Sequence, residues 1–269
     1  MKQSIQKHYD DQARRFGRSP QSTMRDLNTR HLEVARLARA LEQLTGKQRN
    51  CKVLEIGCGN GYALGKLSKL LDCKFFGIDT NRAMIRIASG RRLKNVTFRV
   101  DDILGPRLRE RDFDVVFSER CLINLETWRM QERALEGIRR ILRRGGHYVM
   151  LEMFEDGLNE LNGARRAVGL EKIPPAWHNR HLKKAELEKY MKGRFENVLR
   201  KSSGVAYDNF LSSYFFGSRV LYPALMQGKG EIEYNNKFVK FFSGSPPSGN
   251  YSPIQLCILR KTQETPGSV

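Results

Sequence analysis

The sequence is poor in acidic residues and has no long apolar run. Its 269 residues include 29 Asp and Glu against 48 Lys and Arg, which gives a formal net charge of +19 at pH 7. No apolar stretch reaches the ~18 residues of a membrane-spanning helix. The first ten residues are polar and of mixed charge, unlike a secretory signal. We therefore expect no transmembrane segment and, with 40% hydrophobic residues, a full buried core in one elaborated domain or two small ones.

Cysteine is scarce and scattered. The five cysteines are odd in number and show no C-x-x-C spacing; they are Cys51, Cys58, Cys73, Cys121 and Cys257. This pattern argues against a disulfide framework or a zinc site, and no cluster of His, Cys and Asp has metal-ligand spacing. We expect all five to be packing residues, no bound metal, and a cytoplasmic location, where thiols stay reduced.

The excess of positive charge could attract nucleic acid, an anionic membrane surface or an acidic substrate. The basic residues are spread along the chain, in groups such as 107–111 and 139–144, and are not gathered in one block. A generally basic, solvated surface explains the composition equally well. Nucleic acid and peripheral attraction to an anionic membrane therefore stay open as partners beside a small-molecule or glycan acceptor.

The segment Lys52 to Gly61 reads K-V-L-E-I-G-C-G-N-G. Its apolar run stops at three glycines on alternate positions, which predicts a buried strand, a tight turn and a helix. Glycine permits positive φ and a close approach of a ligand, toward which the following helix would direct its free N–H groups. A second apolar run ends at Asp79, in the position where an acidic residue commonly bonds a ribose hydroxyl.

The glycine spacing separates two nucleotide cofactors. A dinucleotide site needs G-x-G-x-x-G, and counting from Gly57 its third glycine would fall at Tyr62. The pattern E-x-G-x-G-x-G from Glu55, followed by a strand that ends in Asp79, resembles the class I S-adenosylmethionine-dependent methyltransferases. The alternative is a strand–turn–helix of an unrelated α/β protein.

Strand and helix patterns alternate five times as far as the apolar run His147 to Phe154, which predicts a parallel sheet with helices on both faces. The resemblance implies an α/β, Rossmann-like fold with a seven-stranded, mostly parallel sheet in the order 3-2-1-4-5-7-6. We expect ligands beyond the carboxyl ends of the strands.

The chain is expected to divide into four parts. They are residues 1–45, an N-terminal arm and helix over the cofactor site; 46–206, the methyltransferase core, with an insertion at about 155–182; 207–251, a helical, aromatic-rich cap; and 252–269, the last strand and a polar tail. The cap, together with the insertion, would shape the acceptor pocket. The alternative for the cap is a self-contained helix whose aromatic residues form their own core.

The resemblance also implies cofactor-binding residues. Tyr9, in the segment H-Y-D-D-Q-A-R-R-F, would stack on or hydrogen-bond the cofactor, unless this segment is only a docked tail. Arg30 could reach the cofactor carboxylate, although an exposed helix arginine is the alternative. Met84 would pack on the adenine, and Asp102 and Ile103 would hydrogen-bond it. The implied set is Tyr9, Arg30, Glu55, Gly57, Cys58, Gly59, Asp79, Thr80, Met84, Asp102, Ile103 and Ser118.

The acceptor side is suggested by three stretches. P-P-A-W-H-N from Pro174, L-N-G-A-R-R-A-V-G-L before it and S-Y-F-F-G-S-R-V-L-Y-P-A-L after it resemble bacterial methyltransferases often placed in surface-polysaccharide or glycan gene clusters. His178 lies in the proline-rich turn and titrates near neutrality, so it is the candidate catalytic base. A histidine that satisfies loop hydrogen bonds is the alternative, and His181 and Glu152 are further candidates for the base.

We expect transfer of a methyl group from S-adenosylmethionine to a hydroxyl of a small molecule or glycan. A first alternative is an RNA methyltransferase. Enzymes that methylate exocyclic amino groups of bases usually carry N/D-P-P-Y or N-L-P-Y after the fourth strand, whereas this chain has Ser118-Glu119-Arg120-Cys121. A second alternative is a non-catalytic cofactor-binding protein, against which the intact glycine turn and Asp79 speak.

Overall fold

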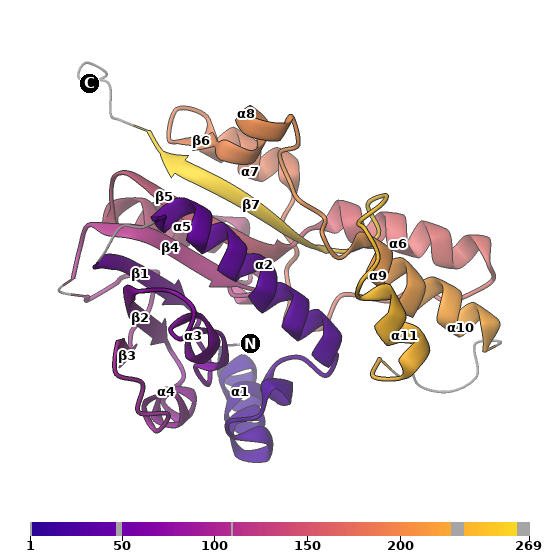
Figure 1. Cartoon of the computed structure of the whole chain (residues 1–269), viewed down its shortest axis with the longest axis horizontal. Helices are drawn as coiled ribbons and strands as arrows, with labels where there is room; N and C mark the ends of the chain where they lie inside the picture. Colours follow the sequence, from indigo (N-terminus) through magenta and orange to yellow (C-terminus); the bar gives the residue numbers. More distant parts are fainter. Residues whose placement is uncertain (1, 47–49, 109, 227–233, 263–269) are drawn as a thin grey trace.

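The computed structural model describes residues 2–46, 50–108, 110–226 and 234–262, which Figure 1 shows. A seven-stranded sheet runs through the molecule in the order β3-β2-β1-β4-β5-β7-β6. Its strands are β1 (Cys51–Ile56), β2 (Cys73–Asp79), β3 (Val96–Val100), β4 (Phe113–Glu119), β5 (Leu142–Met153), β6 (Phe195–Asn197) and β7 (Ile254–Lys261). Strands β1 to β5 pair in parallel, and β7 is antiparallel to β5 and β6. The predicted fold class and strand order are confirmed. Residues 263–269, which belong to the predicted tail, lie outside the described residues.

Helices cover both faces of the sheet because its central strands are apolar on both sides. Val53 and Leu54 of β1 illustrate this, since successive side chains of a strand point to opposite faces and these two belong to different core clusters. The first cluster packs against α2 (Leu27–Thr45) and α3 (Tyr62–Leu67). The second packs against α5 (Trp128–Ile141) and α7 (Lys184–Met191).

The carboxyl ends of the parallel strands meet at one edge of the sheet. The glycine turn follows β1 there, and α4 (Arg82–Ser89) follows β2. Asn81 caps α4, because its side-chain oxygen accepts the Met84 N–H at 2.8 Å. The short 3-10 helix η2 (Leu122–Asn124) follows β4 at the same edge.

The N-terminal segment lies against this edge. It forms α1 (Lys2–Phe16) and the 3-10 helix η1 (Pro20–Ser22). Asn60, in the glycine turn, donates through Nδ2 to the carbonyls of Gly17 at 2.8 Å and Ser19 at 2.9 Å. Asn81 donates through Nδ2 to Asp10 Oδ1 at 2.7 Å. These bonds fix α1 over the ends of β1 and β2.

The remaining helices gather toward one end of the molecule and along β7 (Figure 1). They are α6 (Glu155–Ala167), α8 (Val198–Ser203), α9 (Ser212–Phe216), the π-helical turn η3 (Gly217–Leu221), α10 (Tyr222–Leu225) and α11 (Lys237–Phe242). The predicted cap contains α9 to α11, and its residues 227–233 lie outside the described residues. Asp26, at the start of α2, accepts hydrogen bonds of 2.7 Å from Tyr214 Oη and from Arg219. This buried contact attaches the cap to α2.

The cysteines differ from the sequence expectation. Cys51 and Cys73 form a disulfide, so the expectation that all five cysteines are packing residues is wrong for these two. They begin β1 and β2 and stand opposite each other in register, with Cα atoms 4.8 Å apart. The pairing register of β1 and β2 brings the two cysteines together. Their separation of 22 residues in the sequence does not predict this contact. The argument for a reducing compartment loses its support, and a cytoplasmic location stays a prediction.

Candidate active site

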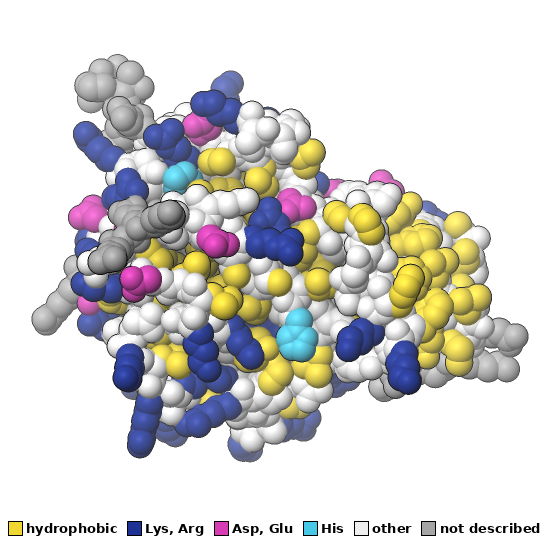
Figure 2. Space-filling view, viewed as in Figure 1, with side chains coloured by type: hydrophobic (Ala, Val, Ile, Leu, Met, Phe, Trp, Pro, Cys, Tyr) yellow, Lys and Arg dark blue, Asp and Glu magenta, His cyan; other side chains and the backbone are white. Residues whose placement is uncertain are grey.

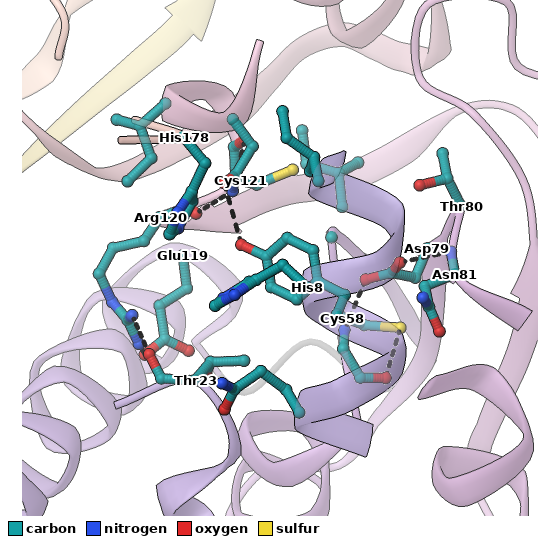
Figure 3. Close-up of a pocket in the computed structure, with 18 of the residues that line it drawn as sticks. His8, Thr23, Cys58, Asp79, Thr80, Asn81, Glu119, Arg120, Cys121 and His178 are labelled. Atoms are coloured by element: carbon teal, nitrogen blue, oxygen red, sulfur yellow. Dashed lines mark hydrogen bonds and ion pairs between the residues drawn. The ribbon is translucent and has the colours of Figure 1, made fainter. Parts of the chain in front are cut away.

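A cavity of about 780 Å³ lies at the carboxyl edge of the sheet, between the strand ends and α1. Figure 3 shows Asp79, Thr80 and Asn81 on one side of it and Cys121 and His178 on the other. Its walls come from the glycine turn, the ends of β2 and β3, the β4–η2 turn, α1 and the loop 176–179. Segments far apart in the sequence therefore share one cavity.

The glycine turn has the positive φ angles that its three glycines predict. Gly57, Gly59 and Gly61 have φ of 68°, 50° and 72°, a region that side chains disfavour. A Cβ at Gly57 would collide with the Cys121 thiol, whereas a Cβ at Gly59 would meet nothing within 4 Å. Gly59 therefore keeps its part of the wall clear, where a methyl group would occupy space otherwise open to a ligand.

Asp79 joins the end of β2 to this turn. Its Oδ2 accepts the Gly59 N–H at 2.9 Å, and its Oδ1 accepts the Asn81 N–H at 2.8 Å. Burial raises the pKa of Asp79, and these backbone N–H groups oppose the rise. Each carboxylate oxygen has a further lone pair available for hydroxyl groups of a ligand.

Glu55 lies in β1 beneath the turn and is fully covered. Its Oε2 has no hydrogen-bond partner among the described residues. Burial raises the pKa of Glu55 well above its usual range, and the negative charge of Glu119 makes a smaller contribution in the same direction. A positive charge brought into the cavity would stabilise this carboxylate.

The cavity wall is acidic although the chain is basic. Among the described residues, six acidic side chains line it: Glu55, Asp79, Asp101, Asp102, Glu119 and Glu126. Four basic side chains of the same set line it: Arg15, Arg25, Arg30 and Arg120. An excess of acidic side chains around the cavity suits a cationic ligand. The excess of basic residues that gives the chain its net charge of +19 therefore lies elsewhere on the protein.

Two buried arginines are held by two buried glutamates beside the cavity. Arg30 forms an ion pair with Glu119, and Arg120 donates through Nε to Glu33 at 2.9 Å. Burial raises the pKa of Glu33 to about 8. Burial alone would also raise the pKa of Glu119, but Arg30 and Arg120 outweigh it and lower that pKa. The Nη1 group of Arg30 therefore binds Glu119, whereas its Nε has no hydrogen-bond partner among the described residues.

At the other end of the cavity, α1 meets the loop that carries His178. The His178 ring lies 4.6 Å from the His8 ring and 6.2 Å from the Tyr9 ring, measured between centroids. Tyr9 donates from its hydroxyl to Asn124 Oδ1 at 2.9 Å. Burial, and then His8, lower the pKa of His178. Its Nδ1 is covered and has no partner among the described residues.

The structure brings most of the predicted cofactor residues together. Those that line the cavity are Tyr9, Arg30, Glu55, Gly57, Cys58, Gly59, Asp79, Thr80, Asp102 and Ile103. Met84 and Ser118 lie outside it. Met84 is buried in α4, where Ser22 contacts its sulfur. The Ser118 hydroxyl bonds Tyr148 Oη at 2.7 Å and Glu152 Oε1 at 2.6 Å.

Of the three candidates for the base, His178 alone lines this cavity in the part of the chain that the structure describes. Glu152 is buried, and its Oε1 also accepts the N–H groups of Cys121 and Leu122 at 3.0 Å each. Its carboxylate thus shapes the β4–η2 turn. His181 is buried outside the cavity, and burial lowers its pKa to about 4.

Sequence reasoning missed four residues that shape the site. Asn124 accepts a hydrogen bond from Tyr9, His8 contacts His178, and Glu33 and Glu119 accept hydrogen bonds from the two buried arginines. Each of these residues contacts a partner more than eighty positions away in the sequence, so no local sequence motif indicates its role. Among the described residues, no three His, Cys, Asp or Glu side chains gather where they could hold a metal ion.

A family model described as a methyltransferase domain matches residues 47–201, more than half of the chain. The chain therefore belongs to this family. It is an enzyme of the S-adenosylmethionine-dependent methyltransferase class, and S-adenosylmethionine is its cofactor.

Curated relatives cover a smaller part. The malonyl-[acyl-carrier protein] O-methyltransferase of Bacillus cereus is 35% identical over 107 residues, 39% of this chain and 39% of that protein. The protein of the same name from Bacillus cytotoxicus is 35% identical over 108 residues, 39% of this chain and 37% of that one. The match thus spans about two fifths of the length of these relatives.

Solved structures share the fold at low identity. A chain of the complex between the Haloferax volcanii Trm112 methyltransferase activator and a methyltransferase has a TM-score of 0.56 at 15% identity, covering 90% of this chain and 96% of that one. Geranyl diphosphate methyltransferase in complex with GPP and sinefungin has a TM-score of 0.52 at 13% identity, covering 85% and 77%. At these identities the likeness shows the fold alone.

The residues present fit the cofactor. S-adenosylmethionine carries a positive sulfur, and among the described residues more acidic than basic side chains line the cavity. The open space above Gly59 allows close approach of a ligand to the backbone.

Proposed function

We propose that this protein transfers a methyl group from S-adenosylmethionine to a hydroxyl of a small molecule or glycan, by in-line displacement with His178 as general base. The observation that carries the proposal is the position of His178. The loop at 176–179 brings it into the cavity that also contains the glycine turn and Asp79. A group able to take a proton thus shares one enclosure with the cofactor-binding elements.

The cofactor would be held by the residues at the strand ends. Asp79 would bond the ribose hydroxyls, Asp102 and Ile103 the adenine, and the backbone at Gly57 and Gly59 would approach the amino-acid part. When bound there, the cofactor supplies a methyl group on a positively charged sulfur. The acidic wall would favour this cation, and Tyr9 on α1 would cover it.

The protein's own contribution at the acceptor end is to hold the hydroxyl and remove its proton. A hydroxyl is a weak nucleophile until a base takes its proton. The lowered pKa of His178 keeps its imidazole neutral near pH 7, so it is available as a base. The curated relatives are O-methyltransferases by name, which favours oxygen as the accepting atom, although the malonyl group that they name presents a carboxylate and not a hydroxyl.

RNA as the acceptor has less support. A cluster of basic side chains, Arg143, Arg144, Lys201 and Arg260, lies together with His147 at the start of β5 and the end of β7. That is the sheet edge opposite the cavity, so this cluster does not line an approach to His178. The acidic wall of the cavity would also repel a phosphate backbone.

The test is transfer of labelled methyl groups from S-adenosylmethionine to panels of sugars, other hydroxylated small molecules and RNA. We expect label on a hydroxylated small molecule or glycan, loss of transfer in His178→Ala, and unchanged binding of S-adenosylhomocysteine to that variant. Normal turnover in His178→Ala would reject the base. Label on RNA alone would reject the acceptor class.

A further inference from the structure

Large apolar side chains are exposed on the last helices of the cap. Four of them lie on α10, on the residue that follows it and on α11: Leu225, Met226, Phe238 and Phe241. Phe241 is 75% exposed and Leu225 is 68% exposed. Figure 2 shows hydrophobic side chains gathered over the end of the molecule that carries the cap. Scattered single apolar residues are ordinary on a protein surface, but a contiguous group marks a contact site.

Ring contacts join these side chains into one surface. The Phe238 ring lies 5.5 Å from that of Tyr222 and 5.3 Å from that of Phe242, and Phe242 lies 5.5 Å from Phe241. Leu225 and Met226 stand three and four positions after Tyr222, on the same side of α10. We call Leu225, Met226, Phe238 and Phe241, together with Lys237 and Lys240, the cap surface.

The charged side chains that the structure describes in the part of the cap from α9 to α11 are all basic. From Leu211 to Tyr251 the described residues include three basic side chains and no Asp or Glu. Arg219 is buried in its ion pair with Asp26, so among the described residues of this part of the cap the exposed charge comes from Lys237 and Lys240. Both lysines are exposed, and neither has an ion-pair partner among the described residues.

We propose that the cap surface docks on an anionic phospholipid membrane. Exposed Phe and Leu beside lysines are typical of segments that lie in the headgroup region of a bilayer. Phe241 and Leu225 would enter that region, and the lysines would face the lipid phosphates. No helix in the described ranges is long and apolar enough to cross a bilayer, so the contact would be peripheral.

The charge distribution favours lipid over a second copy of the chain. A two-fold dimer through this surface would place the lysines of both copies in one interface, where no acidic side chain among the described residues from Leu211 to Tyr251 could pair with them. An anionic membrane pairs the same lysines with opposite charge, and the net charge of +19 adds long-range attraction. The inference concerns a surface away from the cavity and does not depend on the proposed acceptor.

The test is co-sedimentation of the full chain with vesicles of phosphatidylcholine alone and of phosphatidylcholine with phosphatidylglycerol. We expect binding to the mixed vesicles that weakens as salt is added, because salt screens exposed charges. The double variant Leu225→Ser, Phe241→Ser should lower the partition coefficient by about tenfold or more. The double variant Lys237→Glu, Lys240→Glu should also reduce binding, most strongly at low salt.

Matched variants control for general effects of polarity and charge. Leu70 and Val205, 66% and 54% exposed, lie outside the cap, and Leu70→Ser, Val205→Ser should leave partitioning unchanged. The exposed Lys69 and Lys74 give the same charge change in Lys69→Glu, Lys74→Glu, which should have less effect than the change on α11. Thermal unfolding checks that each variant is folded.

Equal partitioning of the wild type and the Leu225→Ser, Phe241→Ser variant would overturn the proposal, and so would equal losses in that variant and its matched control. Light scattering provides a further readout. A wild-type dimer that this variant dissociates, with vesicle binding unchanged, would assign the surface to a second copy and reject the membrane.

Discussion

The Gly59 N–H donates to Asp79 Oδ2 at 2.9 Å, which couples the turn after β1 to the end of β2. Twenty residues separate the two positions, and both belong to the motif that the sequence displays. The bond means that Asp79 has two tasks, since the same carboxylate fixes the turn and faces the cavity.

Replacing Asp79 by Ala should weaken cofactor binding by about tenfold or more, because a hydrogen bond to a charged group contributes about 1.5–3 kcal/mol. The chain should remain folded, since the sheet register does not depend on this side chain. Titration calorimetry with S-adenosylmethionine measures the affinity, and Asp72→Ala, at an exposed position before β2, is the control. Equal affinity in Asp79→Ala and the wild type would remove Asp79 from the cofactor site.

Gly59→Ala tests the open space in the turn. Gly59 and Gly204 both have positive φ, 50° and 74°, and a Cβ at either position meets nothing within 4 Å. Each substitution should therefore cost about 1–2 kcal/mol of stability through backbone strain alone. Only Gly59→Ala should also weaken cofactor binding, as measured by calorimetry. A matched loss of stability with no loss of affinity would show that the cofactor does not approach Gly59.

The parts of the site that could be predicted are those encoded locally. The strand, glycine turn and helix at 52–71 and the strand that ends at Asp79 are short segments whose residue types set their backbone. Alternation of such units then requires a parallel sheet, and its carboxyl edge brings Glu55, Asp79 and Asp102 together. For this reason the part of the cavity that contains the glycine turn, Asp79 and Asp102 could be predicted from the sequence.

The parts that could not be predicted depend on tertiary register. Cys51 and Cys73 meet only because β1 and β2 pair in a particular register. The ion pair of Arg30 with Glu119 joins α2 to the end of β4. Ser118 matched a family motif, yet its side chain turns toward Tyr148 and Glu152, because alternate residues of a strand face opposite sides.

Tyr9→Phe should loosen α1 over the cavity. The change removes the 2.9 Å hydrogen bond from Tyr9 to Asn124, which contributes about 1 kcal/mol. Amide hydrogen exchange in α1 should become about fivefold faster, since local opening becomes easier. Tyr222→Phe, in the cap, is the control and should leave exchange in α1 unchanged. Unchanged exchange in Tyr9→Phe would mean that the other contacts of α1 hold it in place without this bond.

The pH dependence of turnover should identify His178. Burial and His8 lower its pKa below the ordinary value of about 6.5, so the neutral, basic form should predominate at pH 7. The rate should fall as the pH drops through that lowered pKa and should be flat above it, because protonated imidazole cannot accept the hydroxyl proton. The unfolded chain binds this proton more tightly than the folded one, so stability should also decrease as the pH falls through about 6.5.

The exposed His31 provides the matched comparison. His31→Ala should keep the acid limb of the rate profile, and His178→Ala should lose turnover while binding S-adenosylhomocysteine with wild-type affinity. Imidazole nitrogen shifts followed by NMR give the pKa of His178 directly. An acid limb that survives in a still-active His178→Ala variant would assign the base to another group, because that variant has no imidazole at this position.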